Sequence, residues 1–130
     1  MSFDVLDYEP PRRWAAASVA GGFVFLAGET GTDPVTLETA PGGVEAQTEQ
    51  AFRNMEATLA RLGLGLDSIV RLTVYLTDIA DLPRVGATRA RHLRRTLPST
   101  TVQVSALARD DLLVEIDAIA LAAPDASATP

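Results

Sequence analysis

Hydrophobic residues follow a strand-like pattern near the start of the chain. Ser18–Ala20 and the apolar run Phe23–Ala27 are separated by Gly21 and Gly22, and two short runs joined by two glycines are typical of a β-hairpin. The second run is apolar at every position, so we expect both of its faces to be covered. Gly28 is expected to end this strand and to open a loop over 28–43, and loops of this length are often functional.

Two later segments show the spacing of amphipathic helices. From Val44 onward, apolar residues recur every three or four positions, which predicts a helix of about 19 residues. A second pattern starts at Asp81, the candidate N-cap, and its apolar stripe extends to Leu97 before Pro98 ends it. The remainder of this helix is basic, which is typical of a solvated face, with an anion-binding patch as the alternative. The arginines concerned are Arg84, Arg89, Arg91, Arg94 and Arg95.

Three further segments are predicted to be strands. Ser68–Leu76 alternates polar and apolar residues, Thr100–Val104 is short, and Leu112–Leu121 is long. An additional strand within Phe3–Asp7 is left open. The resulting order is β-β-α-β-α-β-β, and we expect an antiparallel hairpin at each end of the chain.

This order predicts an α+β domain in which two helices cover one face of a mixed sheet. Residues 1–124 form that single domain, and 125–130 are expected to be a flexible C-terminal tail. The strands are too apolar for the other face to remain open to water, so that face should pack against further copies of the chain. A homo-oligomer is predicted on this ground.

Composition excludes several kinds of site. The 130 residues include no cysteine and one histidine, His92, which argues against structural zinc and leaves only an all-carboxylate magnesium site open. All 11 basic residues are arginine, so no lysine can form a Schiff base. The formal net charge of −6 argues against a nucleic-acid partner. We expect no cofactor and no metal, and His92 is expected at the surface.

The ends and the apolar runs indicate where the protein acts. No apolar run approaches the roughly 18–20 residues that span a bilayer, so no membrane association is expected. The acidic N-terminus lacks a signal pattern, and the absence of cysteine suits a reducing compartment. A cytoplasmic location is therefore expected.

Four stretches, in order, resemble the RidA/YjgF family of small trimeric proteins. They are FVFLAGE (Phe23–Glu29), VEAQTEQAFRNM (Val44–Met55), RLTVYLTD (Arg71–Asp78) and VEIDAIAL (Val114–Leu121). The resemblance runs from about Trp14 to Leu121. It implies a chorismate-mutase-like α+β subunit and a homotrimer whose sheets face inward, with a small-molecule pocket in each of three clefts between subunits.

The resemblance also implies an activity, the hydrolysis of 2-imino or enamino acids to 2-keto acids and ammonia. That chemistry needs a cation for the substrate carboxylate, which arginine suits best, together with a positioned water and a proton donor. In catalytic members of the family the arginine lies just before the fifth strand. Here that segment reads Leu97-Pro98-Ser99-Thr100-Thr101-Val102, so Ser99 or Thr100 stands where the arginine belongs.

Other positions of the family pocket can be matched. Trp14 stands where the family usually has a tyrosine, Gly28 matches the pocket glycine, and Glu115 matches the pocket glutamate of the last strand; the asparagine of the second helix falls on Gly86. We therefore expect a ligand cleft in which Glu115 positions water or the ligand. Its other predicted lining residues are Trp14, Gly28, Ser99, Thr100 and Thr101.

Three functions follow as hypotheses. The first is a RidA-like protein that binds or acts on a small polar metabolite other than a free 2-imino acid. The second is an imine/enamine deaminase of the 2-iminobutanoate/2-iminopropanoate type, in which Arg12, Arg13 or Arg109 replaces the missing arginine. The third is a non-catalytic structural or regulatory trimer. An RNA-cleaving role, sometimes attached to this family, has no support in the acidic charge.

Overall fold

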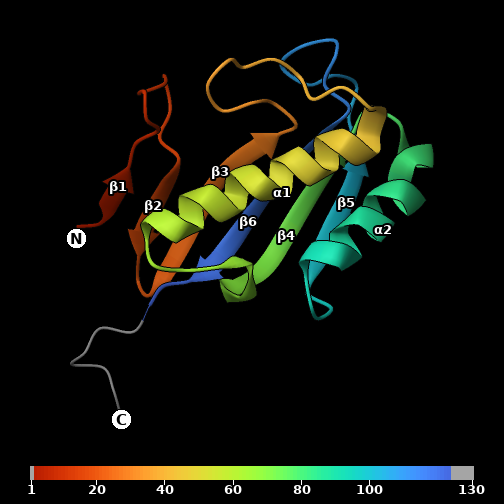
Figure 1. Cartoon of the computed structure of the whole chain (residues 1–130). Helices are drawn as coiled ribbons and strands as arrows, with labels where there is room; N and C mark the ends of the chain where they lie inside the picture. The colour runs from red at the N-terminus through yellow and green to blue at the C-terminus, as the bar shows by residue number, and fades with distance from the viewer. Residues whose placement is uncertain (1, 124–130) are drawn as a thin grey trace.

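The computed structural model describes residues 2–123, which form a six-stranded sheet with both helices on one face (Figure 1). The sheet order is β1-β2-β3-β6-β4-β5. The α+β class with two helices on one face is confirmed, and the tail predicted over 125–130 lies outside the described residues. The strands are β1 (Asp4–Leu6), β2 (Ala17–Ala20), β3 (Phe23–Thr30), β4 (Ile69–Leu76), β5 (Ser99–Gln103) and β6 (Val114–Leu121). The α-helices are α1 (Gly43–Arg61) and α2 (Leu82–His92). Two short 3-10 helices, η1 (Leu66–Ser68) and η2 (Ile79–Asp81), precede β4 and α2.

The hairpin predicted near the N-terminus is confirmed. β2 and β3 pair antiparallel, and Ala20 lies opposite Phe23. Gly21 and Gly22 have φ angles of 59° and 85°, which is the left-handed backbone that a two-residue hairpin turn requires and that glycine adopts at little cost. β1 adds a further antiparallel strand beside β2.

The hairpin predicted at the C-terminal end is wrong. β5 pairs with β4 in parallel, whereas β6 inserts between β3 and β4 and pairs antiparallel with both. The connection through α2 brings β5 back parallel to β4, as crossover helices do. β6 buries Val114, Ile116, Ala118 and Ala120 and suits the centre of the sheet, while β5 is largely exposed and lies at its edge.

Of the two helices predicted from the sequence, only α2 ends at a different place in the structure. α1 has the expected length of 19 residues, but α2 stops at His92, before the predicted end at Leu97. Leu93 has extended backbone angles and is buried, so its packing ends the helix early. Asp81 caps nothing with its side chain; Asp78 instead accepts a hydrogen bond from the amide of Ala80 at the start of η2.

The core lies between α1 and the sheet. Phe52, Met55 and Leu59 of α1 are fully buried against strand residues that include Leu72 and Ile116. His92, expected at the surface, is half-buried between the two helices. Its ring stacks on Phe52 at 5.0 Å between centroids, and its Nε2 lies 2.7 Å from Glu49 Oε2, because α1 and α2 pack side by side.

The helix-free face of the sheet carries exposed apolar side chains. Phe23, Phe25 and Leu121 are 41%, 43% and 52% exposed, and Phe23 lies opposite Leu121 in the register. Figure 1 shows both helices on the opposite face. The fold therefore leaves this surface uncovered within one chain.

Candidate functional site

Glu115 stands near the start of β6, between Thr30 of β3 and Tyr75 of β4. Its side chain lies over Gly28, where a Cβ would come within 2.6 Å of Glu115 Oε2. Contrary to expectation, Gly28 does not end the strand. A bulge between Leu26 and Glu29 interrupts the register and lets β3 continue to Thr30. Glycine at position 28 thus leaves room for the Glu115 carboxylate.

Three of the predicted site residues meet in one cavity. Trp14, Gly28 and Glu115 line a hollow of about 180 Å³, together with Arg12 and Arg109. The indole of Trp14 is 58% exposed and forms part of an open wall. The remaining lining residues are Glu29, Thr30, Thr32, Leu37, Ala108 and Leu112.

The other three predicted residues are not brought into this cavity. Ser99, Thr100 and Thr101 lie on β5, at the edge of the sheet, separated from β6 by β4. Two of their hydroxyls accept hydrogen bonds from arginines of the same chain, Ser99 from Arg89 at 2.9 Å and Thr100 from Arg71 at 2.8 Å. Within one chain these residues form a separate polar patch.

The arginines that could replace the missing one behave differently. Arg109 lines the cavity, but all its nitrogens are engaged: Nη1 donates to the carbonyl of Leu37, Nη2 donates to Thr39, and Nε lies 3.3 Å from Asp111. It therefore ties the loop after β3 to the loop before β6. Arg13 is not among the cavity residues.

Arg12 is the available guanidinium. Its Cζ lies 4.0 Å from the centroid of the Tyr8 ring, a cation–π contact, and its N–H groups donate no hydrogen bond to any other described residue. Within residues 2–123 it forms no salt bridge with a carboxylate. The cavity therefore contains a cation able to take a ligand carboxylate in a bidentate manner.

Sequence reasoning missed Glu29 as a site residue. Glu29 is 6% exposed, and the hydroxyl of Tyr8 donates to its carboxylate at 3.1 and 3.2 Å. Burial raises the pKa of Glu29 to about 7, against the lowering effects of the Tyr8 hydrogen bond and the Arg12 charge. The only available signal was a glutamate at the end of an otherwise apolar strand, and nothing local marks Tyr8 as its partner.

A second carboxyl group in the cavity is also perturbed. Burial and, secondarily, the charge of Asp117 raise the pKa of Glu115. Asp117 points to the same face two residues along and accepts a hydrogen bond from Tyr75 at 2.9 Å. A glutamate whose pKa is raised holds a proton more readily than an ordinary glutamate does, which suits general acid–base chemistry.

The part of the chain that the structure describes shows neither a metal-binding cluster nor a membrane-spanning helix. Over residues 2–123, no three histidine, cysteine or acidic side chains lie close enough together to hold a metal ion. In the same range, no helix has the length and apolarity needed to cross a membrane.

The chain is a two-layer α+β domain, and its carboxylate-lined cavity lies where the bulged strand β3 meets the last strand β6. These two features define the class of protein. The family described as "Endoribonuclease L-PSP" matches residues 7–122. The chain therefore belongs to this family, and the resemblance to RidA/YjgF proteins is confirmed.

Individual relatives agree with this membership. The chain is 45% identical over 103 residues to protein DfrA of Myxococcus xanthus, covering 78% of each. It is 33% identical over 102 residues to the 2-iminobutanoate/2-iminopropanoate deaminase of Mus musculus, covering 78% of this chain and 75% of that protein. The crystal structure of a YjgF/YER057c/UK114 family member from Mycobacterium tuberculosis is similar with a TM-score of 0.78 and 30% identity, over 92% of this chain and 99% of that one.

Proposed function

We propose that the cavity beside Glu115 binds or acts on a small polar metabolite that carries a carboxylate and is not a free 2-imino acid. The observation that carries this proposal is that Arg12, Trp14 and Glu115 line one cavity. The sequence match, which aligns Ser99 or Thr100 with the arginine of the family, is the reason to propose a ligand other than a free 2-imino acid. Arg12 would hold the carboxylate, Trp14 would pack on the ligand, and Glu115 would hold water or exchange a proton.

The site is proposed to be completed by other copies of the chain. A volume of about 180 Å³ lies below the roughly 300–1,000 Å³ of most small-molecule pockets, and the uncovered face of the sheet is apolar. A homotrimer whose sheet faces meet would cover that face. It would also allow Ser99, Thr100 and Thr101 of one copy to complete the cavity of the next.

The binding experiment uses the single tryptophan. Because Trp14 lines the cavity, its fluorescence should change when small carboxylates are titrated into the protein. Arg12→Gln should weaken the affinity about tenfold, the size of one lost charge-assisted contact. Arg53→Gln, which removes an exposed guanidinium paired with Glu49, should leave it unchanged. A screen of keto acids, hydroxy acids and amines that never perturbs Trp14 would contradict the proposal.

A second candidate is imine deamination with a displaced arginine. Arg12 lies in the cavity with Glu115, and one relative is named as a 2-iminobutanoate/2-iminopropanoate deaminase. Generating 2-iminopropanoate with an amino-acid oxidase and following pyruvate release separates the two candidates. Acceleration that is lost in Arg12→Gln supports this second candidate. A rate equal to that without the protein supports the first.

A further inference from the structure

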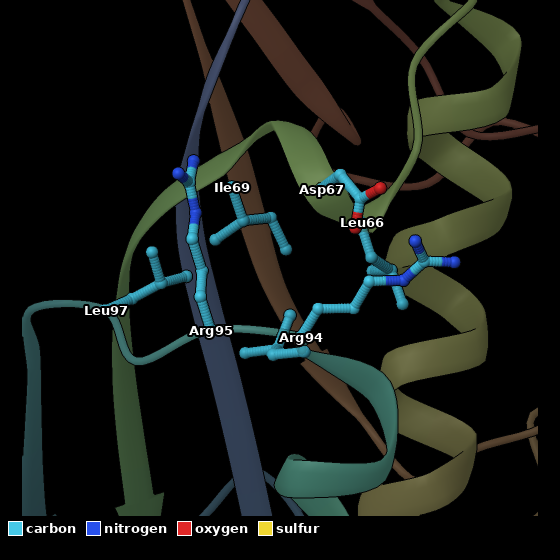
Figure 2. Close-up of a pocket in the computed structure, with 7 residues that line it drawn as sticks. Leu66, Asp67, Ile69, Arg94, Arg95 and Leu97 are labelled. Carbon is cyan, nitrogen blue, oxygen red and sulfur yellow. The ribbon is translucent and has the colours of Figure 1, made fainter.

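A second cavity lies at the start of β4, whereas Glu115 lies beside the end of that strand. Figure 2 shows the residues that line it. It has a volume of about 360 Å³ and is formed where η1, the start of β4 and the connection from α2 to β5 meet. Along β4, Ile69 in this cavity is six residues from Tyr75, which faces Glu115. At about 3.3 Å per residue the two sites are roughly 20 Å apart.

The floor of this cavity is aliphatic. Leu66, Ile69 and Leu93 are 8%, 1% and 8% exposed, and Leu97 is half-buried beside them. These side chains belong to the edge of the core, so the floor is held in place by the fold. An apolar ligand surface placed here would be removed from water at about 25 cal/mol per Å².

The rim of the cavity is cationic. Arg94 and Arg95 follow the early end of α2, and Figure 2 shows their guanidinium groups directed to different sides of the cavity. Over residues 2–123 neither makes a hydrogen bond or a salt bridge, whereas Arg84 pairs with Asp81 and Arg91 pairs with Glu49. Asp67 supplies the one carboxylate of the lining.

We propose that this cavity binds a small monocarboxylate with an aliphatic body. The carboxylate would pair with Arg94 or Arg95, and the alkyl group would lie on the aliphatic floor. Two guanidinium groups and one carboxylate leave a single positive charge, which a ligand of charge −1 neutralises. Inorganic phosphate would leave the floor in water, and an amine would face two cations. This site is independent of the function proposed for the cavity beside Glu115.

The test is a titration of the ¹⁵N-labelled full chain with 4-methylpentanoate, followed by NMR. The amides of Leu66, Ile69 and Leu93 should shift, while the indole N–H of Trp14 reports separately on the other cavity. Acetate, which lacks the alkyl body, and 4-methylpentan-1-ol, which lacks the charge, should each bind about tenfold more weakly. The proposal would be overturned if acetate bound with the same affinity as 4-methylpentanoate, or if only the Trp14 indole shifted. It would also be overturned if the three amides did not shift at about 10 mM 4-methylpentanoate.

Matched variants locate the interaction. Arg94→Gln and Arg95→Gln should each weaken binding of 4-methylpentanoate several-fold, and the double variant about tenfold or more. Arg84→Gln removes the same charge, but Arg84 lies within α2 and outside the cavity, so this variant should bind as the unaltered protein does. Equal affinity of the double variant and Arg84→Gln would show that the arginines do not form the site.

Discussion

The hydroxyl of Tyr8 donates to the buried carboxylate of Glu29, with distances of 3.1 and 3.2 Å to its two oxygens. Tyr8 precedes β2, whereas Glu29 follows the bulge in β3. The contact joins the N-terminal segment to the strand that carries Gly28. It also places a titratable group in the wall of the candidate site.

Glu29 should make the free energy of unfolding fall as the pH rises from the pKa of this residue in the unfolded chain to its higher pKa in the folded chain. Burial raises its pKa from 4.5 to about 7 in the folded chain, so the folded state holds this proton more tightly than the unfolded state. The contribution is present below about pH 4.5 and is lost as the pH approaches 7, with a size on the order of 3 kcal/mol.

The variant Glu29→Gln isolates this contribution, because glutamine keeps the size and can still accept the Tyr8 hydrogen bond. Urea denaturation of both proteins at about pH 5 and about pH 8 should show a smaller loss of stability in the variant. Glu115, whose pKa is also raised, is present in both proteins, so its own titration contributes to both pH profiles. Parallel pH profiles would contradict the assignment.

Gly28 and Gly31 should respond differently to alanine. A Cβ at position 28 meets the carboxylate end of the Glu115 side chain at 2.6 Å, whereas a Cβ at position 31 meets the backbone Cα of Gln47 in α1. Gly28→Ala should displace the carboxylate and weaken ligand binding while costing less than about 1 kcal/mol of stability. Gly31→Ala should cost about 1–3 kcal/mol, as overpacking does. Thermal denaturation combined with the Trp14 titration checks both, and a stable Gly31→Ala protein would speak against the packing described.

The two arginines of the candidate site should separate binding from stability. Arg109 ties two loops together through Leu37, Thr39 and Asp111, so Arg109→Gln should lower the unfolding free energy by about 1 kcal/mol. Arg12→Gln should leave stability nearly unchanged and reduce ligand affinity. Urea denaturation and the Trp14 titration measure the unfolding free energy and the ligand affinity of each variant. A loss of affinity in Arg109→Gln but not in Arg12→Gln would assign the ligand carboxylate to Arg109.

The apolar face should determine the oligomeric state. Phe25 is 43% exposed on the helix-free side of the sheet, so Phe25→Arg should convert the proposed trimer into monomers with unchanged helix content. Val35, 81% exposed in the loop after β3, provides the control, and Val35→Arg should leave the assembly intact. Light scattering coupled to size-exclusion chromatography gives the mass, and a monomeric unaltered protein would refute the trimer.

Local patterns along the sequence were sufficient for most elements. The Gly21-Gly22 turn, the length of α1 and the alternation in β4 depend on residues close together in the chain, and each agrees with the structure. The motifs that resemble the RidA/YjgF family span several such elements, and membership is confirmed by the match over residues 7–122.

Only the tertiary structure determined which strands are neighbours and which side chains share a cavity. The position of β6 between β3 and β4, the stacking of His92 on Phe52 and the contact of Tyr8 with Glu29 all join distant residues. Periodicity reports which face of an element is apolar, but not which element covers that face. For the same reason, the sequence could predict that Trp14, Gly28 and Glu115 belong to one site. Only the distances in the structure show that Arg12 is available to a ligand while Arg109 is engaged by its neighbours.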